Sequence, residues 1–313
     1  MFSYVLRRLA GSLPVMGVLA LLVFSLLYLA PGDPALIIGG DLATPKDIAA
    51  IRENLGLNEP FLSRFGLWVS GVAQGDLGRS IFTGLPVSEL ILQRLEPTIA
   101  LLVMTTIVAL AIAIPAGVIA AHRPGGWIDR LLMVLSVLGF SLPSFVLAYL
   151  LLLGFSVKNE WLPVYGYVSI REGVVPFLRH ICLPSLALGL IYASLIARIT
   201  RASMLEVLGQ DYIRTARAKG VSTLRMLWSH ALRNASVPIV TVVGTGLGLL
   251  ISGAVVTETV FAIPGIGRLT VDAVLRRDYP IIQGVTLMFS AAYVLINLLI
   301  DISYTIIDPR IRY

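Results

Sequence analysis

Charged residues and cysteine are both scarce in this chain. Asp, Glu, Lys and Arg make up 13% of its 313 residues, against about 25% in an ordinary soluble domain, so a water-soluble globular protein is excluded. Cys182 is the only cysteine, which excludes a disulfide framework and a paired-cysteine metal site within the chain. The three histidines, His122, His180 and His230, fall in separate segments and do not predict a common metal site.

Several motifs of nucleotide and hydrolytic chemistry are also missing. The chain has no Gly-x-x-x-x-Gly-Lys-Ser/Thr loop, so it is not expected to bind ATP. It has no Gly-x-Ser-x-Gly elbow, no His-Glu-x-x-His pair and no carboxylates clustered within an apolar stretch. No catalytic residue, cofactor or metal is therefore expected, and any source of energy must lie outside the chain.

Long uncharged stretches dominate what is present. With 57% hydrophobic residues and a mean hydropathy of +0.88, the chain contains six stretches free of Asp, Glu, Lys and Arg. Roughly 20 helical residues cross a hydrocarbon core of about 30 Å, so the sequence predicts an all-α integral membrane protein with six transmembrane helices of modest tilt. The stretches are Leu9–Gly32, Pro97–His122, Leu131–Val157, Ile181–Ala197, Asn234–Thr257 and Tyr279–Ile300.

Prolines and glycines within the stretches suggest local features. Pro115 and Pro143 are expected to kink their helices. Gly244, Gly246, Gly248 and Gly253 are expected to permit close helix packing, and lining a pore is the alternative. The first stretch follows Arg7 and Arg8 and is too long for a cleaved secretory signal, so we expect an uncleaved signal anchor.

The distribution of charge predicts the orientation. If the N-terminus is cytoplasmic, the inside segments carry 13 Lys and Arg against 5 Asp and Glu, and the outside segments carry 11 against 13. The segment 198–233 contributes most to this asymmetry. An excess of cations on the cytoplasmic side favours cytoplasmic N- and C-termini. The basic balance, with a pI of about 9.6, is attributed to this topology and not to nucleic-acid binding.

Two loops are too long to be simple connectors. In the outer loop, Asp33 to Glu96, one helix is expected to start with Thr44 as N-cap and Pro45 as first residue, and to stop at Gly56. A second, amphipathic helix is expected after Pro60. Such helices usually lie at a membrane interface or cover the outer end of a bundle, so we expect a cap on the outer mouth, and a substrate site is the alternative.

The second long loop, on the cytoplasmic side, predicts a short elbow. Asp211 is expected to cap a helix from Tyr212 to Lys219, Gly220 to end it in a left-handed turn, and Ser222 or Thr223 to start a second helix through Arg233. Small residues beside cations on the first arm suit docking against another protein. A basic loop that only fixes topology remains the alternative.

These segments resemble the permease subunits of ATP-binding-cassette importers, and more narrowly those of the peptide and nickel uptake group. The similarity extends over nearly all the chain. It is carried by the elbow Arg214–Gly220 followed by Ala231–Asn234 and Pro238, and by Pro31–Pro34, Gly75–Ser80, Glu258–Phe261, Pro264–Arg268, Arg277–Pro280 and Asp308–Arg312. One departure is that the general importer motif begins Glu-Ala-Ala, where this chain has Arg214-Thr215-Ala216. That variant is familiar in the peptide and nickel group.

The resemblance implies a type I importer transmembrane fold and a set of partners. The partners are a second homologous permease, two cytoplasmic ATP-binding subunits and an external solute-binding protein, all around a chain embedded in the lipid of a bacterial inner membrane. The implied divisions are an N-terminal helix 1–32, an external loop 33–96, a transmembrane domain 97–307 with a coupling segment 203–235, and a tail 308–313.

The resemblance also implies two groups of site residues. Contact with the ATP-binding subunits is expected from Asp211, Arg214, Thr215, Ala216, Arg217, Lys219 and Gly220. An outer gate is expected to border Glu258, Phe261, Pro264, Gly265 and Gly267, and an ordinary interfacial turn is the alternative.

Two other classes of function remain as alternatives. A secondary transporter or channel not coupled to ATP would also show six spans, but functional ionisable residues or broken helices are expected near its midplane. A membrane enzyme needs catalytic residues gathered at one interface. The sequence does not identify the solute, for which dipeptides, oligopeptides, glutathione-like peptides, nickel chelates, sugars and opines are all compatible.

The orientation can be tested with single cysteines. In a Cys182→Ala background, cysteines at Ser70 and Ser169 should react with an impermeant thiol reagent in intact cells, whereas cysteines at Ser222 and Thr223 should not. The reverse labelling pattern would place the elbow outside and contradict the predicted topology.

Overall fold

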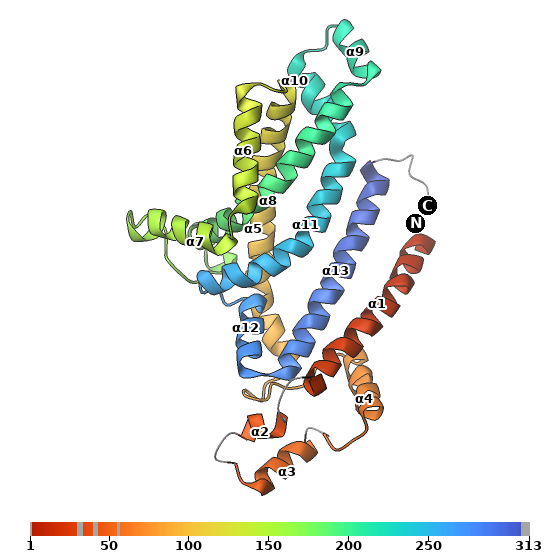
Figure 1. Cartoon of the computed structure of the whole chain (residues 1–313), viewed down its shortest axis with the longest axis vertical. Helices are drawn as coiled ribbons and strands as arrows, with labels where there is room; N and C mark the ends of the chain where they lie inside the picture. The colour runs from red at the N-terminus through yellow and green to blue at the C-terminus, as the bar shows by residue number, and fades with distance from the viewer. Residues whose placement is uncertain (1, 30–33, 40–42, 55–56, 308–313) are drawn as a thin grey trace. The chain divides into compact units, whose positions relative to one another are not determined.

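The computed structural model describes residues 2–29, 34–39, 43–54 and 57–307, and its regular structure is helical (Figure 1). Apart from an isolated bridge between Arg79 and Pro86, these residues form no β structure. The prediction of an all-α protein is therefore confirmed. The helices are α1 Phe2–Leu29, α2 Pro34–Gly39, α3 Pro45–Asn54, α4 Phe61–Ala73, α5 Val87–His122, α6 Trp127–Ser141, α7 Ser144–Leu151, α8 Val174–Leu208, α9 Asp211–Ala218, α10 Thr223–Arg225, α11 Leu232–Val260, α12 Ile266–Arg276 and α13 Tyr279–Ile307, with the tighter or wider turns η1 Leu152–Val157, η2 Ile170–Glu172 and η3 Met226–Ala231.

Five helices are long and apolar enough to cross a membrane, and the bent pair formed by α6 and α7 with η1 makes a sixth span if it is taken as one. The five are α1, α5, α8, α13 and the continuous helix through α10, η3 and α11. Each corresponds to one predicted stretch. Several extend beyond it, since helical hydrogen bonding does not stop where the apolar residues end: α5 begins at Val87 and α8 at Val174.

The third predicted span, Leu131–Val157, is not one straight helix. α6 ends at Ser141, the next helix begins at Ser144, and the two are bent by 104°. Pro143 is the cause, because its ring disfavours a helical conformation in the preceding residue, and Leu142 is extended at φ −80° and ψ 130°. The prediction of one modestly tilted helix is wrong here, and Pro143 breaks the span. α5, by contrast, continues through Pro115.

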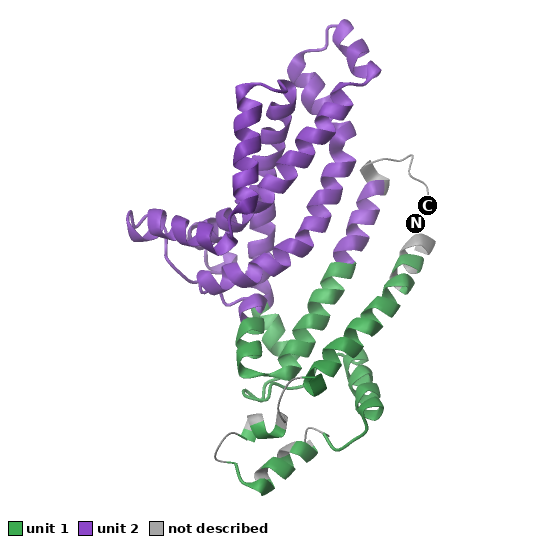
Figure 2. Cartoon of the chain, in the orientation of Figure 1, with its two compact units in different colours: residues 1–94, 269–294 green, residues 95–268, 295–313 purple. Residues whose placement is uncertain are grey.

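The chain divides into two compact units, which Figure 2 colours separately: Met1–Arg94 with Leu269–Val294, and Leu95–Arg268 with Leu295–Tyr313. In the first unit, the aromatic side chains of α1 and α4 form a cluster. Phe24 lies edge-on to Phe61 and Phe65, with ring centroids 5.4 Å apart in both pairs. Arg64 donates to the Tyr28 hydroxyl at 2.6 Å and covers the Phe24 ring. This cluster attaches α4 to α1.

In the second unit, α8 packs against α6, α7 and α11. Its buried side extends from Phe177 to Met204. Glycines on the neighbouring helices permit close approach, and a Cβ added to Gly117 of α5 would lie 2.5 Å from Thr200 Cβ.

The glycines of α11 also allow other helices to approach closely. Methyl groups on Gly244, Gly246 and Gly253 would overlap Ile300, Tyr192 and Leu188, respectively. The expected packing role of these three glycines is confirmed.

The packing predicts a clear stability difference between two glycine substitutions. Gly246→Ala should lower the apparent melting temperature of the detergent-purified protein by several degrees, because overpacking a close contact costs about 1–3 kcal/mol. Gly17→Ala is the matched control, since a Cβ on Gly17 of α1 meets no atom within 4 Å. Equal melting temperatures for the two variants would contradict the close contact with Tyr192.

Candidate functional site

The predicted coupling residues lie on an exposed elbow between α8 and α11. Figure 1 shows α9 beyond the end of α8. Ile213 is fully buried and α9 packs against η3, whereas the charged side chains point into solvent. The exposed members of the predicted set are Asp211, Arg214, Thr215, Arg217, Lys219 and Gly220, with Ala216 half-buried. One apolar side chain thus anchors the elbow and leaves its cations available.

Gly220 ends the first arm in the left-handed conformation that the sequence predicted. Its φ is +79°, and a Cβ added to it would meet no atom within 4 Å. Glycine is therefore required by the backbone conformation and not by lack of space. The turn is closed by Gly220 N donating to the Arg217 carbonyl at 3.0 Å and Val221 N donating to the Ala216 carbonyl at 3.2 Å.

Asp211 does not cap α9 as expected. It is the first residue of the helix, and Gln210 occupies the N-cap position without a side-chain hydrogen bond. The carbonyl of Asp211 accepts from the Thr215 hydroxyl at 3.1 Å, and its carboxylate pairs with Arg214 at 3.3 Å. Both charged side chains are largely exposed, so this ion pair contributes little stability.

The second arm of the elbow is continuous with a membrane helix. It begins at Thr223 with Ser222 as N-cap and runs through Arg233, as predicted, and it continues beyond that residue. Helix α10, the wider turn η3 and α11 together form one helix from Thr223 to Val260. Because α9 packs on η3, the first arm rests directly on the beginning of a span.

Among the predicted outer-gate residues, Glu258 is the centre of a buried hydrogen-bond network. Its side chain is 0% exposed. The Thr98 hydroxyl of α5 donates to Oε1 at 2.6 Å, and the backbone N–H of Arg268 donates to Oε2 at 3.0 Å. Thr98 Oγ1 in turn accepts from Ile266 N at 2.8 Å. The carboxylate therefore lies at the N-terminus of α12, where an anion is stabilised by free N–H groups and the helix dipole.

The glycines of this turn close around the carboxylate. A methyl group on Gly265 would overlap the Glu258 carboxyl carbon, and one on Gly267 would lie 2.6 Å from Val255 Cα. Phe261 is 2% exposed and its carbonyl accepts from Gly166 N at 2.9 Å. Pro264 is exposed. The structure thus joins Glu258, Gly265 and Gly267 in one site and leaves Pro264 on its surface.

A buried ion pair near the elbow was not found by sequence reasoning. Asp129 lies in the first turn of α6 with its side chain 4% exposed. Arg201 of α8 binds it with two hydrogen bonds, of 2.5 Å and 2.7 Å, and Gly125 N donates to it at 2.8 Å. The only sequence feature that points to this pair is a single acidic residue in a basic segment, and charge counting alone does not reveal its partner.

Two motifs of the first unit also meet at a buried carboxylate. Asp278, in Arg277–Pro280, accepts from the Ser80 hydroxyl of Gly75–Ser80 at 2.5 Å and from Ile81 N at 3.3 Å. Both side chains are buried. The Ser80 hydroxyl also accepts from Thr83 N at 3.1 Å. The sequence indicated that both motifs matter, but not that they contact each other.

A fourth carboxylate, that of Glu96 on α5, holds the segment before α8. Its Oε1 accepts from the Ser169 hydroxyl at 2.5 Å and from the Tyr167 hydroxyl at 3.1 Å. Burial, and then the neighbouring carboxylate, raise the pKa of Tyr167 to about 12. Tyr167 therefore remains a protonated donor throughout the physiological range.

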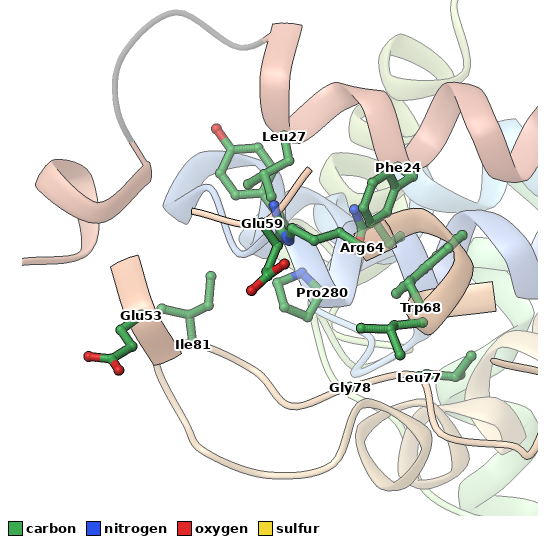
Figure 3. Close-up of a pocket in the computed structure, with 13 residues that line it drawn as sticks. Phe24, Leu27, Glu53, Glu59, Arg64, Trp68, Leu77, Gly78, Ile81 and Pro280 are labelled. Atoms are coloured by element: carbon green, nitrogen blue, oxygen red, sulfur yellow. The ribbon is translucent and has the colours of Figure 1, made fainter. Parts of the chain in front are cut away.

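The first unit contains a pocket of about 370 Å³, shown in Figure 3. In that view the carboxylates of Glu53 and Glu59 lie on one side, and Phe24 and Trp68 on the other. Arg64, which lines the pocket, is already bound to Tyr28. Within the described part of the chain, no group of three or more His, Cys, Asp and Glu residues is placed to hold a metal ion.

Comparison with known families identifies the class of protein. Residues 113–313 match the family described as binding-protein-dependent transport system inner membrane component, and residues 1–102 match the N-terminal family of the same transport systems. The chain therefore belongs to the inner-membrane permease components of binding-protein-dependent ABC importers. Membership implies ATP-binding subunits and a substrate-binding protein as partners.

Similar proteins cover the chain from end to end. A probable peptide ABC transporter permease of Sinorhizobium fredii is 54% identical over 310 residues, which cover 99% of each chain. A putative peptide transport system permease of Brucella abortus is 46% identical, and the glutathione transport system permease GsiC of Escherichia coli is 44% identical, with 100% of each chain covered in both cases.

The solved structures show the same fold at low sequence identity. The methionine ABC transporter MetNI, in inward-facing conformations, matches 70% of this chain and 96% of its own chain, with a TM-score of 0.57 and 17% identity. The expected type I importer transmembrane fold is thereby confirmed.

The Glu258 network predicts the effect of two substitutions. Glu258→Gln places an amide where two donors already converge, and Gly265→Ala inserts a methyl into the carboxylate. Each should lower the apparent melting temperature of the purified protein, since leaving a buried polar group unsatisfied costs about 1–3 kcal/mol. Glu89→Gln on the exposed side of α5 is the control. Melting temperatures equal to that of the control would contradict a structural role of this carboxylate.

Proposed function

We propose that this chain is one of two homologous permease subunits that together form the pathway of an importer for peptides or related small solutes. This proposal is supported by relatives that match the chain from end to end and are named as peptide and glutathione permeases. Selection of the solute rests mainly with a binding protein that delivers it. Hydrolysis of ATP is assigned to two partner subunits.

The ATP-binding subunits dock on the elbow Asp211–Gly220. The observation that carries this proposal is the combination of a single buried anchor, Ile213, with a row of exposed cations that the described chain itself does not use beyond one weak ion pair. Guanidinium groups suit carboxylates and helix C-termini on a protein surface. The general importer motif has a glutamate where this chain has Arg214, so the partner's groove should be more acidic here.

The elbow is well placed to pass movement to the membrane helices. Its first arm follows α8 and rests on η3, so a displacement of α9 acts on α8 and on the helix Thr223–Val260 together. These two helices pack closely, and packed helices move as rigid bodies between discrete arrangements. Alternating access then results from rocking of helix bundles, without covalent chemistry in this chain.

The opposite side receives the binding protein. With both termini and the elbow in the cytoplasm, as the charge distribution favours, Glu258 and the turn Pro264–Gly267 lie toward the external side. We assign this turn to the border of the outer gate. The close fit of Gly265 and Gly267 around a buried carboxylate supports a rigid border.

The docking proposal predicts loss of coupling when the elbow is altered. Gly220→Val forces a β-branched residue into a left-handed conformation, at a cost of about 1–2 kcal/mol, and Arg217→Glu reverses a charge at the docking surface. In proteoliposomes that contain all partner subunits, both variants should insert normally and lose most of the ATP-driven uptake. Either the ATP-binding subunits dissociate or ATP hydrolysis continues without transport.

Two matched controls separate docking from general damage. Gly75→Val introduces the same strain at φ +86° in another open turn, and Arg123→Glu reverses an exposed charge outside the elbow. Both controls should retain coupling between binding-protein-stimulated ATP hydrolysis and uptake. Wild-type coupling in Gly220→Val and Arg217→Glu would refute the assignment of the elbow.

A further inference from the structure

Arg198 was counted with the cytoplasmic segment 198–233, but it lies within the long apolar helix α8, and its charge has no ion-pair partner among the described residues. The guanidinium carbon lies 5.2 Å from the ring centroid of Phe140 on α6, and Nε is buried without a hydrogen-bond partner. Among the described residues no carboxylate lies within ion-pair distance of it. One turn further along α8, Arg201 has a buried partner in Asp129. Of these two cations of α8, Arg198 is therefore the one that can still bind an anion.

The direction of the Arg198 side chain is opposite to that of a snorkelling residue. A long cation near a helix end usually turns toward the nearer water layer, which here is the end marked by Asp129 and Arg201. Helical side chains instead tilt toward the N-terminus of their helix. From Asp129 to Phe140 the axis of α6 advances about 16 Å at 1.5 Å per residue. The contact with Phe140 thus holds the guanidinium about half a hydrocarbon thickness away from the Asp129 end.

Packing between α6 and α8 gives the same level along α6. Gly139 of α6 is so close to Ser194 that a methyl group on it would overlap the hydroxyl. Phe140 therefore lies level with the turn of α8 that precedes Arg198. Stacking on one aromatic ring compensates only a small part of the cost of removing a guanidinium from water. The group needs water or an anion at this depth.

A cavity opens at the same level. It has a volume of about 200 Å³, lies at the break between α6 and α7, and is lined by Phe140, Leu142, Ser144 and Leu195, with Tyr192 and Leu250 among its other walls. Leu195 is one helical turn from Arg198 on the same side of α8. The hydroxyl of Tyr192 is already bound to the Val243 carbonyl, so the cavity offers mainly apolar surface. Phe140 both lines this apolar cavity and contacts the Arg198 guanidinium, and this arrangement matches a solute that carries a carboxylate beside an apolar side chain.

We propose that Arg198 binds the carboxylate of the transported solute and that the cavity at the α6–α7 break takes an adjacent apolar side chain. This inference rests on the proposed importer function and assigns Arg198 as a solute-contacting residue. Charge complementarity identifies the ligand chemistry, namely a carboxylate-bearing molecule such as a peptide with a free C-terminus. Intramembrane ionisable residues typically face a water-filled path.

The test uses the charge of thiol reagents as a probe of the cavity. In the importer assembled with its partner subunits in lipid vesicles, the variant Leu195→Cys in a Cys182→Ala background is treated with an anionic or a cationic methanethiosulfonate. The thiol should react, and the ratio of anionic to cationic rates should fall roughly tenfold in Arg198→Gln, because one nearby positive charge is lost. Arg198→Lys should restore the ratio. Arg123→Gln, which removes an exposed cation elsewhere, should leave it unchanged.

A second measurement tests the ligand. Ala-Phe at millimolar concentration should slow the labelling more than its C-terminal amide does, and the difference should vanish in Arg198→Gln. An unreactive thiol, an unchanged ratio, or equal protection by the two dipeptides or by neither would overturn the proposal. A ratio that instead follows the content of anionic lipid would assign Arg198 to lipid headgroups and overturn it as well. ATP hydrolysis and uptake in the same vesicles distinguish these failures from failure of the importer function.

Discussion

In a hydrocarbon layer, burial of apolar surface does not favour contact between helices over contact with lipid, so close packing and buried polar groups must set helix positions. The second unit depends on this constraint. Gly117, Gly246 and Gly253 let their helices approach side chains that a methyl group would displace. Buried polar groups then fix the register: Asp129 with Arg201 joins α6 to α8, and Glu258 joins the end of α11 to α5 and the start of α12.

The buried carboxylates are neutralised in different ways, and the differences follow from their positions. Asp129 has a guanidinium partner and a backbone N–H. Glu258 has no cation among its hydrogen-bond partners in the described chain, and a hydroxyl and the N-terminus of α12 take that place. A dipolar environment of this kind requires that the surrounding backbone be fixed in advance. Gly265 and Gly267 therefore help to hold the backbone in the position that stabilises the carboxylate.

Apolar stretches alone predicted the class of fold and most spans, because a run of about 20 uncharged residues matches the thickness of a bilayer and is typical of a membrane-spanning helix. The break at Pro143 was underestimated, since proline is tolerated within α5 and breaks the third span. The sequence does not show which polar groups contact each other, because the partners are far apart along the chain. Glu258 and Thr98 are 160 positions apart, and Ser80 and Asp278 are 198 apart. The left-handed conformation of Gly220 was predictable because it depends on the local sequence alone. The start of α9 was not, since Gln210 and not Asp211 is the N-cap residue.

The elbow and the membrane helices place opposite demands on the same segment. Under the docking proposal, a surface that binds another protein needs exposed charge, and a segment that transmits force needs stiffness. The chain meets the first demand with the cations of α9 and the second with Ile213 packed toward η3, where the wider turn is continuous with α11. Force applied to α9 therefore reaches a helix that is held at its far end by Glu258. Under the docking proposal, a movement at the elbow would therefore act on a helix that specific contacts hold at both ends.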